Sequence, residues 1–322
     1  MLRKRGVIIL GLCLLILSQK LLATDYTSVS SGNWSDAAVW SPSGIPGLAD
    51  NVIIAAGHTI TLTDARICNN LTINGFLQIQ ANNFTVNGTT TVNGTLHDND
   101  LGGIDRFNGI INVNPGAVWN TLAVNSSSRI QLYDNINNNT DTMRFSAARF
   151  YASISINGSG VLSAYNLNFS SDGLTVTNNS TVLIKLNLNA SNKSSTWKND
   201  VGSILIFEDA SLLMNTNGTL IASDPNNRVI YRGANQPIKT PIGSAYYNLT
   251  ISNPGTKTLQ NDLIILNNLT VDNTATLSCN QYNITGTPTG LMTMTANTTL
   301  LVGNTSSSTA NSFPSGFIAA NI

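Results

Sequence analysis

Charged side chains are scarce in this chain of 322 residues, because Asp, Glu, Lys and Arg together make up only 10% of it. An ordinary globular domain has about 25%. Acidic and basic residues balance at 16 each, so we expect no basic face that would attract nucleic acid. Glu208 is the only Glu and there are two His, which leaves few side chains for acid–base chemistry.

Long apolar runs with a helical period are also missing beyond the N-terminus. Apolar residues form 42% of the chain, but they are dispersed in runs of three to five residues. Asn accounts for about one residue in seven and, with Ser and Thr, replaces charge as the polar surface. This composition predicts a mature chain that is almost entirely β, with no transmembrane segment.

Residues 1–23 have the pattern of a secretory signal peptide. Arg3 and Arg5 lie in a basic start, the stretch 7–17 is apolar, and Ala23 is a small residue suited to cleavage. The apolar stretch is too short to span a bilayer, which takes about 20 residues. The pattern predicts a secreted or cell-surface protein.

One phrase recurs along the chain: Asn, an apolar residue, Thr, and an aliphatic residue. Because side chains alternate faces in a strand, two inward apolar side chains then flank an outward Thr. The leading Asn is expected to take the left-handed backbone conformation that turns one strand into the next. A short strand and a turn recurring about every 20 residues predict a solenoid. The phrase occurs as 70–73, 83–86, 248–251, 268–271 and, shortened, 283–285.

The phrases extend over residues 63–302, which we interpret as the solenoid repeats. With about 20 to 24 residues per coil there would be roughly 12 to 14 coils. Asn-Gly pairs such as Asn74-Gly75 mark the turns, although Asn-Gly also occurs in antiparallel hairpins. Residues 303–322 are rich in Ser and Thr without a sustained pattern, and we interpret them as a frayed or truncated C-terminal end.

Two cysteines remain after the signal segment, Cys68 and Cys279. In a stack of coils they would lie about ten coils apart, far beyond the roughly 7 Å that a disulfide allows between Cα atoms. Each is therefore expected to be a small buried hydrophobic residue.

Residues 24–62 differ from the repeats and are interpreted as an N-terminal cap followed by the first strands. The open end of a solenoid exposes strand edges and an apolar cross-section, so it needs a cover. Trp34 and Trp40 can supply bulky packing there. The same two residues could instead form a platform for a sugar.

One set of residues in this opening segment has a recognisable arrangement: Trp34, Trp40, Gly44, Pro46, Asp50 to Ile54 and Gly57 to Leu62. In this arrangement the segment resembles the start of G8-type extracellular domains and the N-terminal units of large secreted surface proteins of Bacteroidota. The resemblance implies that the segment begins a right-handed parallel β-helix. The stretches 246–251 and 255–259 are similar to the repeat units of those proteins.

Few residues are candidates for chemistry. His58 lies in a Gly-His-Thr turn, where a surface role is expected, and His97 precedes the run Asp98 to Asp105. Alternating oxygen ligands before Gly, as in residues 98–105, loosely fit a calcium loop, but the spacing departs from the EF-hand and no closing Glu follows. A solvated loop between coils is favoured.

A carbohydrate-active β-helix enzyme is the alternative that the residues leave open. It would need clustered carboxylates with a nearby Arg or Lys on one face of the stack. Two charged groups about 40 residues apart could lie two coils from each other. Residues of both groups are Asp98, Asp100, Asp105, Arg106, Asp134, Asp141, Arg144 and Arg149.

The sequence as a whole predicts an all-β, right-handed parallel β-helix with an N-terminal cap. Its leading functional interpretation is a non-enzymatic, adhesin-like extracellular protein that acts in adhesion, display or the binding of glycans or surface proteins. No catalytic, cofactor-binding or metal-binding residue and no cofactor is assigned, and nucleic acid is not an expected partner. The alternative is a polysaccharide lyase or glycoside hydrolase.

Overall fold

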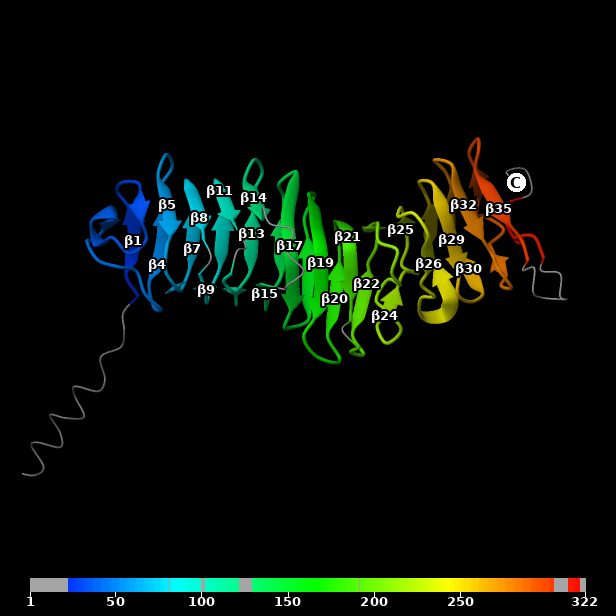
Figure 1. Cartoon of the computed structure of the whole chain (residues 1–322), viewed down its shortest axis with the longest axis horizontal. Helices are drawn as coiled ribbons and strands as arrows, with labels where there is room; N and C mark the ends of the chain where they lie inside the picture. The colour runs from blue at the N-terminus through cyan, green and yellow to red at the C-terminus, as the bar shows by residue number, and fades with distance from the viewer. Residues whose placement is uncertain are drawn as a thin grey trace, which may run out of the picture.

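The computed structural model describes residues 23–80, 82–99, 102–121, 129–190, 192–303 and 312–318. It is all-β, with 49% of residues in strands and 2% in helices, and its parallel strands form a β-solenoid of about 11 turns. Figure 1 shows the coils following one another along one axis, from β1 (Asp25–Ser28) to β35 (Thr299–Leu301). The predicted β-helix is confirmed, whereas the predicted signal peptide lies almost wholly outside the described residues.

Most coils contribute one strand to each of three faces. The first face contains β1, β3 (Trp40–Ser41), β4 (Asn51–Ile54), β7 (Leu71–Ile73), β10 (Thr90–Val92), β13 (Ile111–Val113), β16 (Ile136–Asn138), β18 (Ile154–Asn157), β20 (Thr175–Asn178), β22 (Thr196–Asn199) and β24 (Thr219–Ile221), and then β27 (Ala245–Tyr246), β30 (Leu263–Ile265) and β33 (Ile284–Thr285).

The second face contains β2 (Gly32–Asn33), β5 (Thr59–Leu62), β8 (Phe76–Ile79), β11 (Thr95–Asp98), β14 (Val118–Thr121), β23 (Ile204–Phe207), β25 (Arg228–Tyr231), β28 (Asn248–Ile251), β31 (Leu269–Val271) and β34 (Met292–Met294). The third face contains β6 (Arg66–Cys68), β9 (Phe84–Val86), β12 (Asp105–Phe107), β15 (Ile130–Leu132), β26 (Gln236–Ile238), β29 (Gly255–Leu259), β32 (Ala275–Ser278) and β35. Two short 3-10 helices, η1 (Ala37–Val39) and η2 (Ile242–Ser244), lie outside these faces.

Three longer strands run from the second face onto the third. The first of them, β17 (Thr142–Phe150), pairs with β14 in its first half and with β15 in its second half. The last, β21 (Thr181–Asn189), pairs with β23 in its first half. Among the described residues every strand pairing is parallel except that of β1 with β3. The three strands are β17 (Thr142–Phe150), β19 (Val161–Phe169) and β21 (Thr181–Asn189).

The recurring phrase forms strands in the way that its alternation predicts. In β7, Leu71 and Ile73 are fully buried and Thr72 lies on the outside. Leu71 is in register with Thr90 one coil later, and Thr90 with Ile111, so like positions stack into interior columns. These columns form one continuous hydrophobic core along the axis.

The leading Asn of the phrase does not act as the sequence predicts. Left-handed backbone occurs at other Asn residues, such as Asn253 and Asn273, and not at Asn70 or Asn268. The side chain of Asn70 instead accepts the backbone N–H of Thr89 at 2.8 Å and donates from Nδ2 to Asn51 at 2.8 Å. The Asn is placed there because its amide can bond to the coils on both sides.

Glycine in the Asn-Gly corners is required by close stacking, and not by a hairpin. A Cβ built on Gly94 would lie 2.1 Å from the carbonyl oxygen of Gly75 in the preceding coil. Gly75 would likewise meet the carbonyl oxygens of Ala55 and His58 at 2.3 and 2.4 Å. Asn74-Gly75 therefore joins β7 to β8 at a corner where two coils touch.

The coils are uneven, and their number is about 11, below the 12 to 14 expected from a uniform length. The hydrogen bond that joins Thr89 to Asn70 in the coil before it spans a sequence separation of 19, whereas the bond that joins Asn137 to Asn112 spans 25. Residues 208–218 form turns on the third face with no strand, so that the third-face sheet stops at β21 and resumes at β26.

The N-terminal tryptophans pack inside the cap. Trp34 and Trp40 are 0% and 2% exposed, and their rings meet edge to face at 5.2 Å. Trp34 also contacts the ring of Phe84, and Trp40 Nε1 donates to the Trp34 carbonyl at 2.8 Å. This burial confirms the packing interpretation. Because both rings are buried, neither can form a platform for a sugar.

Residues 312–318 differ from the frayed end that their composition predicts. Ser315 forms a parallel bridge with Thr285 of β33, and the N–H of Gly286 donates to Ser315 at 2.7 Å. The ring of Phe317, which is 7% exposed, packs over Gly286 and covers part of the core. Cys68 and Cys279 are both buried and free, as predicted.

A ladder of Asn side chains follows the first face and offers a test of the stacking. Asn137 Nδ2 donates to Asn112 at 2.8 Å, and Asn157 donates to Asn137 at 3.0 Å. Replacing Asn137 with Ala removes both bonds and leaves both neighbours without them. We expect the free energy of unfolding to fall by about 1–3 kcal/mol in urea denaturation.

The matched control is Asn139→Ala, because the Asn139 side chain is exposed and makes no hydrogen bond to the described residues. It should leave the free energy of unfolding within about 0.5 kcal/mol of the unaltered value. Equal losses in the two variants would contradict a stabilising role for the ladder.

Candidate functional site

The two His residues take part in local packing at separate places. His58 lies in the turn between β4 and β5, and its Nδ1 is 2.9 Å from Ser28 Oγ. His97 lies in β11, where its ring meets that of Phe76 edge to face at 5.8 Å. The turn position expected for His58 is confirmed.

The structure supports no metal site in the part of the proposed calcium loop that it describes. Asp98 ends β11 and Asp105 begins β12, and both are buried, while Asp100 lies outside the described residues. The described ranges contain no group of three or more His, Cys, Asp or Glu that could hold a metal ion.

The charged residues of the enzymatic alternative that the structure describes lie on different faces of the stack. Arg144 lies on the second face, in register with Asn120, whereas Arg106 and Arg149 lie on the third face. Asp134 follows β15 at the corner toward the first face, and Asp141 precedes β17 at the next corner. The described residues of this set are thus spread over two faces and two corners of the stack.

A polar groove instead lies on the outer side of the second face, farther along the rod. Its volume is about 420 Å³, and it crosses β25, β28 and β31, whose outward residues are in register. The floor is the stacked row Ile230, Thr250 and Thr270, which combines methyl groups with hydroxyls. We call it the second-face groove; it is lined by Glu208, Arg228, Ile230, Arg232, Thr250, Ser252, Asn253, Thr270, Asp272 and Asn273.

Charged side chains line this groove in a row that follows the stack. The backbone N–H of Arg232 bonds to the carbonyl of Phe207, which places Arg232 one coil beyond Glu208. The guanidinium of Arg232 forms an ion pair with the Glu208 carboxylate. Asp272 lies two coils beyond Arg232, and its Oδ1 is buried without a hydrogen-bond partner among the described residues.

Arg228 supplies the groove with an uncompensated positive charge. It begins β25, its side chain is exposed, and it forms no ion pair with any residue of the described ranges. Arg232 is already paired with Glu208, so Arg228 is the guanidinium available to a ligand. Within the described lining, the groove thus offers one free cation, one half-buried carboxylate, and several hydroxyl and amide groups.

The turn between β28 and β29 separates this groove from a second hollow of about 450 Å³ on the third face. Lys257 points inward from β29, is fully buried, and donates from Nζ to the carbonyls of Asn253 and Pro254 at 2.7 and 3.3 Å. Burial lowers the pKa of Lys257 to about 8, although the negative charge of Asp272 acts in the opposite direction. The described lining of the second hollow carries no charged residue.

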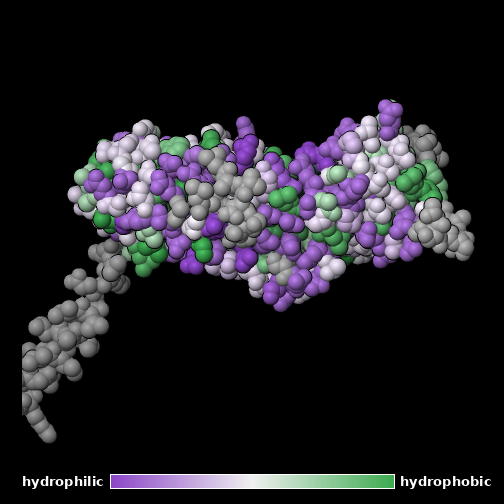
Figure 2. All heavy atoms as spheres, viewed as in Figure 1, coloured by the Kyte–Doolittle hydropathy of each residue, from purple (hydrophilic) through white to green (hydrophobic). Residues whose placement is uncertain are grey.

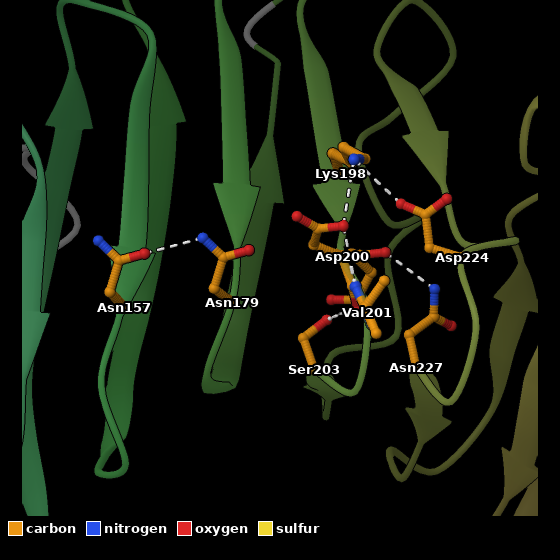
Figure 3. A network of polar contacts seen from close by, with 9 residues as sticks. Asn157, Asn179, Lys198, Asp200, Val201, Ser203, Asp224 and Asn227 are labelled. Atoms are coloured by element: carbon orange, nitrogen blue, oxygen red, sulfur yellow. Dashed lines mark hydrogen bonds and ion pairs between the residues drawn. The ribbon is translucent and has the colours of Figure 1, made fainter.

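A further charged cluster, on the first face, is satisfied internally (Figure 3). Lys198 Nζ lies 3.1 Å from Asp200 and 3.0 Å from Asp224, and hydrogen bonds to these carboxylates raise the pKa of Lys198. The Asn179 side chain donates a hydrogen bond to Asn157 in the side-chain ladder, and the cluster lies on the coils that follow this pair along the stack. Its contacts join neighbouring coils, so we interpret its role as structural.

The large aromatic residues outside the cap are mainly core residues. Trp119, Trp197 and Tyr246 are at most 1% exposed, and Tyr247 is half-buried. Figure 2 shows hydrophilic residues over most of the visible side of the rod, with hydrophobic residues scattered among them. The viewed surface of the described residues therefore has no continuous apolar face.

Comparison with known proteins returns no relative. No family model matches the chain, and no curated protein or solved structure is significantly similar to it. The resemblance to G8-type domains stays a prediction. Among the described residues, no helix has the length and apolar character that crossing a bilayer would take.

The second-face groove was not found by sequence reasoning, which concentrated on residues 98–149. One signal was present: Glu208 and Arg232 carry opposite charges and are 24 positions apart, about one coil. Such a pair becomes a contact only if the intervening coil has that length. Because the coils differ in length, the signal could not be read without the structure.

The buried Lys257 predicts an unusual dependence of stability on pH. An unfolded Lys keeps its proton up to about pH 10.4, whereas folded Lys257 loses it near pH 8. Between these values the unfolded chain binds more protons, so this residue makes the free energy of unfolding rise with pH. The free energy of unfolding should be measured by urea denaturation at pH 7.5 and at pH 9.5. The rise that Lys257 contributes between these two values should be absent from Lys257→Met.

Burial raises the pKa of the Cys68 and Cys279 thiols, which acts in the opposite direction over the same range. The measurement is therefore the difference in slope between the unaltered chain and the variant. Lys193→Met, in a turn, is the control and should keep the original slope. An unchanged slope in Lys257→Met would contradict the assignment.

Proposed function

We propose that this chain is an exported, extracellular rod that binds glycans through the second-face groove and does not transform them. The observation that carries the proposal is the row of outward hydroxyl, amide and charged groups along the stacked strands β25, β28 and β31. Export rests on the signal-peptide pattern of residues 1–23. Adhesion or display would follow from holding such a groove on a rigid stack.

The lining of the groove suits the chemistry of a sugar. A pyranose ring presents hydroxyls around its rim and C–H groups on its faces. The hydroxyls can bond to Thr250, Ser252 and Thr270, while a C–H face packs on the Ile230 side chain. The half-buried Asp272 side chain lines the groove, so its carboxylate can accept a hydrogen bond from a sugar hydroxyl.

The volume and shape also favour a binding role. Small-ligand sites usually have about 300–1,000 Å³, and about 420 Å³ lies at the lower end of that range. The groove is part of a sheet face and continues along the stack direction. An extended chain of sugars can therefore contact several coils at once, each through a few hydrogen bonds.

A carbohydrate-active enzyme remains the alternative, and the spacing of the carboxylates argues against it. Glycosidases place two carboxyl groups about 5–10 Å apart. The backbones of Glu208 and Asp272 lie three coils apart, about 14 Å at the usual strand spacing. The Glu208 carboxylate is also held in an ion pair with the Arg232 guanidinium, so it is not free to approach a glycosidic oxygen.

The test is an array of soluble oligosaccharides, followed by titration calorimetry of the full chain with the best ligand. The variant Arg228→Gln/Asp272→Asn removes the free cation and the half-buried carboxylate while nearly keeping the size of both side chains. We expect its affinity to fall at least tenfold, which corresponds to about 1.4 kcal/mol.

The charge-matched control is Arg144→Gln/Asp141→Asn, because both residues are exposed and lie outside the groove. It should bind the oligosaccharide like the unaltered chain. Equal losses in both variants would contradict the groove assignment. Release of reducing or unsaturated sugar by the unaltered chain, abolished by Glu208→Gln, would support the enzymatic alternative instead.

A further inference from the structure

A second cluster, of arginine, glutamine and tyrosine side chains, lies on the third face, outside the second-face groove. Arg106 of β12, Gln131 of β15 and Arg149 of β17 occupy the same outward position on three successive coils. Tyr133 is the first residue after β15, and Tyr151 is the first residue after β17. These five residues are the arginine–tyrosine patch.

Hydrogen bonds hold the centre of this patch in place. The oxygen of the Gln131 amide accepts from Arg106 Nε at 2.8 Å and from the Tyr133 hydroxyl at 3.4 Å. Its nitrogen donates to the Tyr151 hydroxyl at 3.2 Å. Gln131 is itself only 7% exposed, so it works as a buried support beneath the charged and aromatic side chains. A ligand would therefore meet groups that are already ordered.

Neither of the two guanidinium groups is neutralised within the part of the chain that the structure describes. Arg106 is exposed and bonds only to Gln131, which is uncharged. Arg149 is half-buried, and its Nε is buried with no hydrogen-bond partner among the described residues. Because only 10% of the chain is charged, two unpaired Arg side chains at one position of the stack are a marked concentration of charge.

The spacing of these charges fits a polymer. Arg106 and Arg149 are two strands apart, about 10 Å at the usual strand spacing. Each guanidinium can bind a carboxylate or a sulfate group through two parallel N–H bonds. A linear polyanion lying along the stack can therefore engage both, whereas a single small anion can engage only one.

We propose that the arginine–tyrosine patch binds an anionic polysaccharide bearing carboxylate or sulfate groups, as a site separate from the second-face groove. Nucleic acid is the other common polyanion, and the tyrosines disfavour it. Proteins bind single strands by stacking bases on open aromatic faces. Tyr133 and Tyr151 are stacked on each other at 4.9 Å, with 20° between their planes, so each already covers one face of the other.

Dextran sulfate, polygalacturonate and uncharged dextran of similar length are the probes, applied to the full chain by biolayer interferometry. We expect binding to dextran sulfate or polygalacturonate, weakening as salt is raised, and no binding to dextran. Arg106→Gln/Arg149→Gln should weaken binding at least tenfold. Arg106→Lys/Arg149→Lys keeps both charges but lacks the planar guanidinium groups. Its affinity should lie between that of the unaltered chain and that of the double Gln variant.

Arg144→Gln is the control, because Arg144 lies on the same strand β17 as Arg149 but on the second face. It should bind like the unaltered chain. The proposal is overturned if neither polyanion binds, if Arg144→Gln loses as much affinity as the double variant, or if single-stranded DNA binds more tightly than both polysaccharides. Thermal unfolding of every variant confirms that it is folded.

Discussion

Hydrogen bonds between each strand and the strand one coil earlier set the spacing of the whole molecule. Parallel strands in such a ladder lie about 4.8 Å apart. A side chain within a strand that is paired on both sides therefore has a neighbour of the same orientation at that distance on each side. Inside the rod, this produces continuous columns such as Val52, Leu71, Thr90 and Ile111. On the outer surface, the same spacing aligns polar side chains of successive coils in rows along the stack.

The same spacing explains why so few charges are used. Like charges stacked at about 4.8 Å would repel each other, whereas amides can donate to one coil and accept from the next. Asn137 does so between Asn112 and Asn157. Where charges do occur on neighbouring coils, as with Glu208 and Arg232, opposite signs meet. The high Asn content is thus a direct consequence of stacking.

The features that could be predicted from sequence are those that depend on neighbours within one strand. Alternation of apolar and polar residues identified strands such as β7 and β28, and the bulk of Trp34 and Trp40 identified the cap. The burial of Cys68 and Cys279 followed from the same reasoning. These predictions need no knowledge of coil length.

The features that were wrong or missed depend on contacts between coils. The Asn of the phrase was assigned to a backbone conformation, whereas its true partners, such as Thr89 for Asn70, lie in the neighbouring coils. The charged residues between 98 and 149 were grouped by their spacing, but coils of unequal length place them on different faces. Errors in coil length add up along the chain, so the groove around Arg228 could not be located.

The interruption of the third face at residues 208–218 has a consequence for how the rod comes apart. Stability in a stacked protein is a sum of terms for each coil and for each contact with its neighbours. At this point the sheet of the third face is broken, and on that face the coil is held by single contacts such as those from Gln236 to the carbonyls of Phe207 and Asp209, while the second-face sheet continues through β23. The coupling between coils is therefore weaker there than where all three faces are paired, and a pulling force along the axis is expected to separate the coils first at this point.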